Sequence, residues 1–155
     1  MDYTKLSLTE IIELLNDKKV TSVEITKQCL ATIKNTENLN TLINVFEEDA
    51  LKQATDYDER RKKGEKLPIL AGVPISLKDN FNLINHPTTC ASKFLSNYVS
   101  PYNATVVEKL INAGAIIIGK NNLDEFAMGG STENSAFGPS LNPHNTEYIP
   151  GGSSG

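Results

Sequence analysis

The sequence predicts an α/β protein, and two stretches carry that prediction. Residues 104–113 have apolar side chains at helical spacing, end at Gly114, and lead at once into the apolar run 115–118. A helix that ends at a glycine and continues into a buried strand is typical of α/β proteins. In residues 73–78 apolar and polar side chains alternate, which is the period of a β-strand. We therefore expect residues 73–78 and 115–118 to form a parallel pair.

Composition and charge narrow the class of protein. The 155 residues are 39% hydrophobic and 22% charged, which is ordinary for one globular domain or part of a larger one. A net charge of −4, with basic residues clustered only at 60–63, argues against direct nucleic-acid binding. No signal-type apolar core follows the first residues and no arginine precedes Arg60. We expect a cytoplasmic protein that makes no contact with a membrane.

The sequence of residues 1–63 predicts three helices. Ser7 and Glu10 have the spacing of a capping box, and apolar residues follow it, so a helix should begin here and end near residue 19. Thr21 and Glu24 repeat the pattern and predict a second helix through about residue 34. Residues 42–46 read as a short strand or extended piece. Residues 47–63 predict a third helix with charges on most faces, which indicates a solvated outer helix.

The rest of the chain alternates strands, helices and long loops. We expect, in order, the strand at 73–78, an ordered loop at 79–103 with a short helix around 92–98, the helix at 104–113, the strand at 115–118, a short helix at 122–128 and a loop-dominated region at 129–155.

The strand predicted at 73–78 carries a lysine, Lys78, that could act as a base. Its alternation puts Ser76 and Lys78 on one face and apolar side chains on the other. A lysine that is shielded from water loses part of its preference for the charged form, and its neutral amine can then act as a base. The alternative is an ordinary lysine at a strand end whose ammonium group reaches solvent. The stretch alone leaves both readings open.

Two glycine-containing stretches could be binding or catalytic loops. Residues 114–121 match the spacing of a phosphate-binding loop up to Asn121, but three consecutive isoleucines there favour an extended strand over a flexible curve, so we reject that reading. Residues 150–155, Pro-Gly-Gly-Ser-Ser-Gly, combine hydroxyls with glycines that let backbone amides approach a reacting atom. Alone they could equally be a flexible linker, but the loop 131–143 leads into them without a change of composition.

Five stretches together resemble the amidase-signature family. They are Val-Pro-Ile-Ser-Leu-Lys-Asp-Asn (73–80), Thr-Thr-Cys-Ala-Ser (88–92), Asp-Glu-Phe-Ala-Met-Gly (124–129), Ser-Thr-Glu-Asn-Ser-Ala-Phe-Gly-Pro (131–139) and Pro-Gly-Gly-Ser-Ser-Gly (150–155). The third and fourth are most similar to a branch of the family that works as the glutaminase subunit of a tRNA-dependent amidotransferase. The resemblance covers nearly the whole chain and is weakest before Leu39.

The resemblance implies an amidase-signature fold, which is a mixed β-sheet covered by helices. Residues 1–155 would be the N-terminal portion of a single amidase domain. Within it, residues 1–66 would be helical and residues 67–155 would begin the catalytic α/β core.

The resemblance also implies a Ser-cisSer-Lys triad. Lys78 matches the family's base, and Ser153 matches the bridging serine, which follows a cis peptide bond. A base must lie within hydrogen-bond reach of the hydroxyl that it deprotonates, so we expect Lys78 to be buried with its amine near Ser153. The family's nucleophilic serine would lie downstream of residue 155, so this chain alone should be inactive. Met128, Gly129 and Ser154 would bind the substrate, and no metal is implied.

For the intact protein the resemblance implies a glutaminase that passes ammonia to its partners, the amidotransferase B and C subunits, which together convert Glu-tRNA(Gln) to Gln-tRNA(Gln). No cofactor is implied in this chain, because the partner subunit would use ATP and Mg. Contact with tRNA would come only through the complex. Two alternatives stay open: a stand-alone amidase of another small amide, and a chain that only binds a partner.

Overall fold

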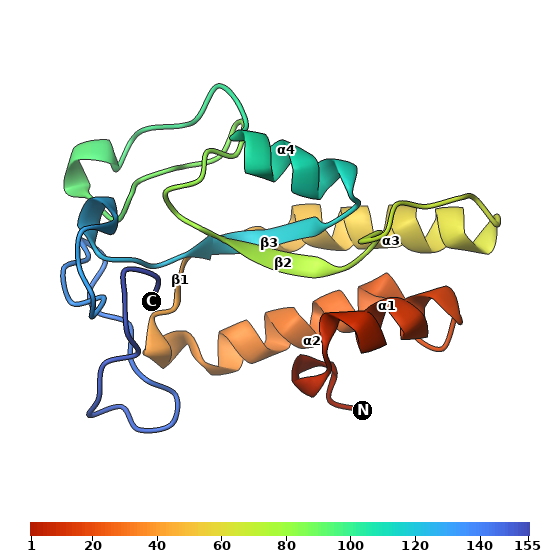
Figure 1. Cartoon of the computed structure of the whole chain (residues 1–155), viewed down its shortest axis with the longest axis horizontal. Coiled ribbons are helices and arrows are strands. Elements are labelled where there is room, and N and C mark those ends of the chain that lie inside the picture. The colour runs from red at the N-terminus through yellow and green to blue at the C-terminus, as the bar shows by residue number, and fades with distance from the viewer. The chain divides into compact units, whose positions relative to one another are not determined.

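The predicted α/β class is confirmed by the computed structural model, which describes residues 1–155. Its elements (Figure 1) are the helices α1 (Leu8–Asn16), α2 (Ser22–Asn35), α3 (Glu47–Lys62) and α4 (Thr105–Asn112), and the strands β1 (Leu42–Val45), β2 (Pro74–Lys78) and β3 (Ile116–Asn121). Every helix longer than one turn therefore lies where the sequence predicts it. No helix combines the length and the apolar character that crossing a membrane requires.

The three strands form one mixed sheet in the order β1-β3-β2. β1 runs antiparallel to β3. At one end of the other pair Ile116 N donates to Val73 O, and at the other end Asp79 N donates to Asn121 O. The residue numbers of these partners rise together along both strands, which is parallel pairing. The predicted parallel pair is thus confirmed, and Figure 1 shows β2 and β3 as neighbouring arrows.

The chain divides into two compact units that alternate along the sequence. The first consists of Met1–Asn35, Phe46–Ile75 and Lys109–Ile118, and the second of Thr36–Val45, Ser76–Glu108 and Gly119–Gly155. Strands β2 and β3 each begin in the first unit and end in the second. The division of a single amidase domain at residue 66 stays a prediction.

In the first unit both predicted capping boxes are present. Ser7 Oγ accepts a hydrogen bond from Glu10 N at 3.3 Å, while Glu10 Oε2 accepts one from Ser7 N at 2.7 Å. Thr21 and Glu24 exchange the same two bonds at the start of α2. Each box satisfies amide groups that a helix N-terminus leaves unpaired, so the two helices begin where the sequence predicts.

Helix α3 is less solvated than predicted. Ala50 and Ala54 are completely buried and pack with Ile116 and Ile118 of β3. Residues four apart share a face of a helix, so these two small side chains form a narrow apolar contact on a helix that is otherwise charged. The sequence did not reveal this contact, because charged residues occupy most faces of the helix and only two alanines form its apolar face.

In the second unit β3 continues to Asn121, three residues beyond the predicted end at Ile118. A Cβ atom at Gly119 would lie 2.5 Å from Asn44 O on the neighbouring strand β1. Only glycine allows the two backbones to approach so closely. Gly119 therefore belongs to a strand although glycine is depleted in strands.

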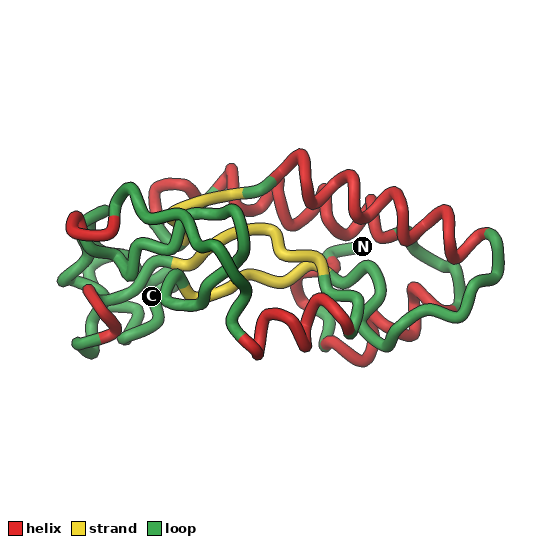
Figure 2. Tube along the Cα trace, turned by 90° about the horizontal axis from the view of Figure 1, so that it is seen from above, coloured by secondary structure: helices red, strands yellow, loops and turns green.

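Most of the second unit is irregular chain, drawn in green in Figure 2. The helix predicted at 92–98 is a single 3₁₀ turn, Lys93–Leu95. The helix predicted at 122–128 is wrong, since only Glu125–Ala127 forms a 3₁₀ turn. Phe126 and Ala127 have positive φ values of 52° and 61°, which a right-handed helix does not allow.

Candidate functional site

The side chains of Lys78 and Ser153 meet although 75 positions separate them. Lys78 is the last residue of β2, and its Nζ donates a hydrogen bond to Ser153 Oγ at 2.6 Å. Both residues belong to the second compact unit. The peptide bond between Gly152 and Ser153 is cis. The structure therefore brings together the two residues that the sequence resemblance assigns to proton transfer.

The burial expected for Lys78 is not observed. Lys78 is half-buried, whereas Ser76, on the same face of the strand, is exposed. Leu77 points to the opposite face and is buried, as the alternation predicts. This face of the strand is open to solvent at Ser76, and Lys78 at its end keeps part of that exposure although it meets Ser153.

Backbone hydrogen bonds hold Ser153 from the side of β3. Asp124 N donates to Ser153 O at 3.1 Å, and Gly155 N donates to Asn122 O at 3.1 Å. Ser154 forms an antiparallel bridge with Leu123 between these two bonds. The glycine- and serine-rich segment is therefore an ordered, paired piece of chain and not a flexible linker.

A buried carboxylate organises the loop beside this segment. Asp124 Oδ2 accepts hydrogen bonds from Ser131 N at 3.3 Å and Thr132 N at 3.0 Å, and Asp124 Oδ1 accepts one from Asn134 N at 3.4 Å. The side chain of Asp124 is completely buried, so these amides replace the water that the carboxylate has lost. A side chain at Gly152 would collide with the same carboxylate.

A second buried carboxylate follows Lys78 directly. Asp79 Oδ1 pairs with Lys120 Nζ at 2.7 Å, and neither side chain is exposed to solvent. Asp79 Oδ2 accepts from Thr89 N at 2.9 Å and from Thr89 Oγ1 at 2.5 Å. Burial lowers the pKa of Lys120, and the hydrogen bond that Lys120 Nζ donates to Asp79 opposes that shift.

All three protons of Lys120 have acceptors, because Nζ also donates to Pro87 O and Thr88 Oγ1, each at 3.2 Å. The pair therefore ties the loop at 87–89 to the residue after Lys78. This fixes the end of the strand that presents the candidate base.

The three predicted substrate-binding residues differ in how close they lie to Lys78 and Ser153. Ser154 is exposed and adjoins Ser153 in the chain. Gly129 is exposed and lies against Asp124, where a Cβ atom would collide with the carboxylate. Met128 follows the 3₁₀ turn, and 78% of its surface is exposed. Their role in binding stays a prediction.

The arrangement is suited to moving a proton between an amine and a hydroxyl. In the form shown, the ammonium of Lys78 donates to Ser153 Oγ; a neutral amine in the same position would accept the Ser153 proton instead. The serine oxygen could then take a proton from a third group, which is how a hydroxyl nucleophile is activated without histidine.

Sequence reasoning did not identify the residues that hold this pair. Asp79 and Asp124 lie inside motifs that carry the family resemblance, so their presence was visible but their function was not. Lys120 lies two residues after the apolar run 115–118, outside the strand predicted from the sequence. A lysine that is buried must pair with an acid, but no pattern near Lys120 in the sequence indicated that it would be buried.

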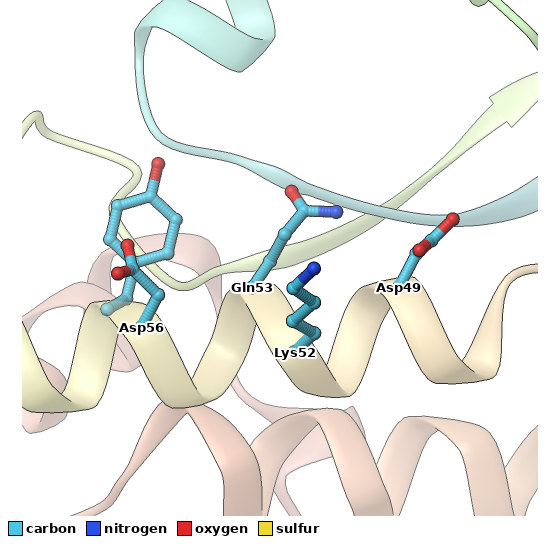
Figure 3. A pocket seen from close by; sticks show the side chains of 5 residues that line it. Asp49, Lys52, Gln53 and Asp56 are labelled. Atoms are coloured by element: carbon cyan, nitrogen blue, oxygen red, sulfur yellow. The ribbon is translucent and has the colours of Figure 1, made fainter.

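The structure has another concave feature on α3. A depression of about 400 Å³ is lined by Asp49, Lys52, Gln53, Asp56 and Tyr57. Figure 3 shows the lining side chains along the helix. None of the predicted site residues lines the depression. Its side chains carry both signs of charge and include no pair of nucleophile and base, so it does not compete with Lys78 and Ser153 as a catalytic site.

Comparisons with known proteins agree with the geometry. A sequence model of the family described as Amidase matches residues 24–155. Over its whole length the chain is 49% identical to the A subunit of glutamyl-tRNA(Gln) amidotransferase from Thermoanaerobacter pseudethanolicus, and it covers 32% of that protein. The chain thus spans about a third of the length of the curated relatives that it matches.

Solved structures agree as well. The crystal structure of the A subunit of glutamyl-tRNA(Gln) amidotransferase from Thermotoga maritima matches 99% of this chain and 31% of its own, with a TM-score of 0.79 and 38% identity. Native peptide amidase from Stenotrophomonas maltophilia matches 98% of this chain and 33% of its own, with a TM-score of 0.88 and 30% identity.

Proposed function

The chain belongs to the amidase family, and from this premise we propose that it is part of the glutaminase subunit of a tRNA-dependent amidotransferase. The intact protein would release ammonia from glutamine for the conversion of Glu-tRNA(Gln) to Gln-tRNA(Gln). The observation that carries the proposal is the hydrogen bond of 2.6 Å between Lys78 Nζ and Ser153 Oγ. The similarity to A-subunit sequences, at 49% identity over the whole chain, supports this choice of amide.

In the proposed reaction neutral Lys78 takes the proton of Ser153, and Ser153 takes the proton of a nucleophilic serine. That nucleophile would attack the carboxamide carbon of glutamine. The C–N bond would break as the Lys78–Ser153 pair returns a proton to the nitrogen, which leaves as ammonia, and water would then hydrolyse the ester to glutamate. The family resemblance assigns the nucleophile to a position outside residues 1–155. Met128, Gly129 and Ser154 would contact glutamine.

The steps after ammonia release would be carried out by partner subunits. The B and C subunits of the amidotransferase would assemble with this protein in the cytoplasm, and tRNA would be bound only through the complex. The partner subunit would use ATP and Mg to activate the glutamate carried by the tRNA. This chain would then need neither a metal nor a nucleotide of its own.

The first prediction tests the base. In the full-length protein assembled with its partners, Lys78→Ala should lower glutamine-dependent amidation of Glu-tRNA between about a hundredfold and ten-thousandfold, because general base catalysis is worth that much. Amidation with added ammonium should persist, because the partner's chemistry does not use this base. Both rates are measured on the same preparation.

The matched control is Lys66→Ala, which removes an exposed lysine and should change neither rate. Equal loss of the two activities in Lys78→Ala would contradict the proposal. So would glutamine-dependent activity at the wild-type level.

A stand-alone amidase is the second candidate. The likeness to peptide amidase, with a TM-score of 0.88, favours it. The two candidates share Lys78 and Ser153 and differ in the substrate. Purification of the full-length protein with or without the B and C subunits, followed by assays with glutamine and with peptide amides, separates them.

A further inference from the structure

We propose that Thr132 is a positioning residue, which holds residues 151–153 so that Ser153 Oγ stays within reach of Lys78. The inference rests on the proposed function, because it takes proton transfer between Lys78 and Ser153 as the step that needs precise geometry. Thr132 contacts neither of the two side chains. It acts through the backbone two residues before Ser153.

The contacts of Thr132 lead directly to that backbone. Thr132 is completely buried, and its Oγ1 donates a hydrogen bond to Gly151 O at 2.8 Å. Its amide donates to Asp124 Oδ2 at 3.0 Å. Asp124 N in turn donates to Ser153 O at 3.1 Å. Asp124 and Thr132 therefore hold the segment at two points, one at Gly151 and one at Ser153.

The backbone of Thr132 is itself unusual. Its φ is 61°, a left-handed value that β-branched residues rarely adopt. Such a conformation persists only where the surrounding structure fixes it, and it is frequent at functional sites. Here the carboxylate of Asp124 fixes the amide of Thr132, and this orientation directs the hydroxyl toward Gly151.

The hydroxyl matters because proton transfer is sensitive to distance. Lys78 Nζ and Ser153 Oγ lie 2.6 Å apart, within the range in which a base can take a proton. A displacement of about 1 Å caused by a change outside the reacting groups can lower a rate about a hundredfold. Without the bond to Gly151 O, the backbone hydrogen bonds that hold the segment against residues 122–124 would all lie at Ser153 or after it.

The test compares Thr132→Val with Thr132→Ser in the full-length protein assembled with its partners. Valine keeps the size and the β-branching of threonine and removes only the donor, whereas serine keeps the donor. We expect Thr132→Val to lower kcat for glutamine hydrolysis by about 10- to 100-fold with little change in KM. Thr132→Ser should retain most of the wild-type kcat.

Ser100→Ala is the matched control. Ser100 is also completely buried, and its hydroxyl donates to a backbone carbonyl, Tyr102 O, at 2.7 Å. Its backbone and hydroxyl bonds stay within residues 85–102. The variant loses the same kind of bond in the same compact unit, so its thermal stability should fall while kcat does not.

The outcomes separate this inference from the proposed function. If glutamine hydrolysis survives Lys78→Ala and Ser153→Ala, the proposed function is wrong and this inference falls with it. If those variants are inactive but Thr132→Val keeps wild-type kcat, only this inference is overturned. A fall in kcat that is equal in Thr132→Val and Ser100→Ala would also overturn it.

Should Thr132→Val not fold, Thr132→Cys takes its place. Because the thiol of cysteine is a weak donor, the kcat of Thr132→Cys must fall below that of Thr132→Ser.

Discussion

At the scale of single residues, two lysines of the second unit have opposite roles. Lys120 is buried, pairs with Asp79, and has an acceptor for each of its protons, so it has none to exchange with a substrate. Lys78 is half-buried and meets a hydroxyl. A base must be able to give up its proton and regain it, and only Lys78 is placed for that.

The contrast leads to a prediction about stability. Asp79→Asn should destabilise the protein by about 3 kcal/mol or more, because it leaves the ammonium of Lys120 buried without its counter-charge. Asp79→Asn combined with Lys120→Met should recover part of the loss, since no charge is then left unpaired. Thermal unfolding of the full-length protein measures both effects.

Asp58 offers a matched control for this prediction. Its carboxylate accepts two backbone hydrogen bonds, from Ser22 N and Val23 N, where that of Asp79 accepts one amide and one hydroxyl of Thr89. Its charged partner Arg61 is 3.5 Å away, and both side chains keep some contact with solvent. Asp58→Asn should therefore destabilise less than Asp79→Asn. A larger loss at Asp58, or a double variant less stable than Asp79→Asn, would show that the buried pair is not what holds this region.

At the scale of elements, the capping boxes make α1 and α2 sensitive to acid. Hydrogen bonds from the hydroxyl and the amide of Ser7 lower the pKa of Glu10, and those from the amide and the hydroxyl of Thr21 lower the pKa of Glu24. A carboxylate whose pKa is lower in the folded state stabilises the fold above its ordinary pKa. That stabilisation is lost as the pH falls from about 4.3 through the lowered value.

We therefore predict that the first turns of α1 and α2 open as the pH falls below about 4.3. Amide hydrogen exchange, expressed as protection factors, should show lower protection for residues 8–11 and 22–25 at pH 3.5 than at pH 6. Glu10→Gln should remove the pH dependence from α1 alone, because glutamine does not titrate. Unchanged dependence of α1 in that variant would mean that another group controls the first turn.

A structural feature could be predicted from the sequence where the residues that cause it lie close together in the chain. The start of α1 follows from Ser7 and Glu10, three positions apart, and was predicted to the residue. The end of β3 was missed, since Gly119 and Lys120 suit a strand only because β1 lies close and because Asp79 supplies a charge 41 positions away. No short-range pattern contains either reason.

The same distinction applies to the site. Lys78 and Ser153 were identified through motifs, and the structure adds the bond between them. The contribution of Asp124 could not be read from its motif, because its carboxylate bonds to amides seven to ten positions later. Those bonds draw residues 122–128 into an irregular loop, which is also why the predicted helix is absent there.

At the scale of the whole molecule, the chain brings Lys78 and Ser153, the pair proposed to transfer a proton, into hydrogen-bond contact but spans about a third of the length of its curated relatives. The resemblance assigns the nucleophilic serine to the part of the family domain outside residues 1–155. Lys78 and Ser153 can move a proton, but releasing ammonia also needs an atom that attacks the amide carbon. Removing a nucleophile lowers a rate by several orders of magnitude even when its partners remain.

We therefore predict that residues 1–155 alone do not hydrolyse glutamine, whereas the full-length protein does. Ammonia release is measured for both at equal concentration, with Lys78→Ala made in each. Turnover by residues 1–155 that Lys78→Ala abolishes would contradict the prediction, because the attacking group would then lie within these residues. The exposed hydroxyl of Ser154, next to the pair, would be the first to test, since Ser154→Ala would remove such turnover while leaving the Lys78–Ser153 bond in place.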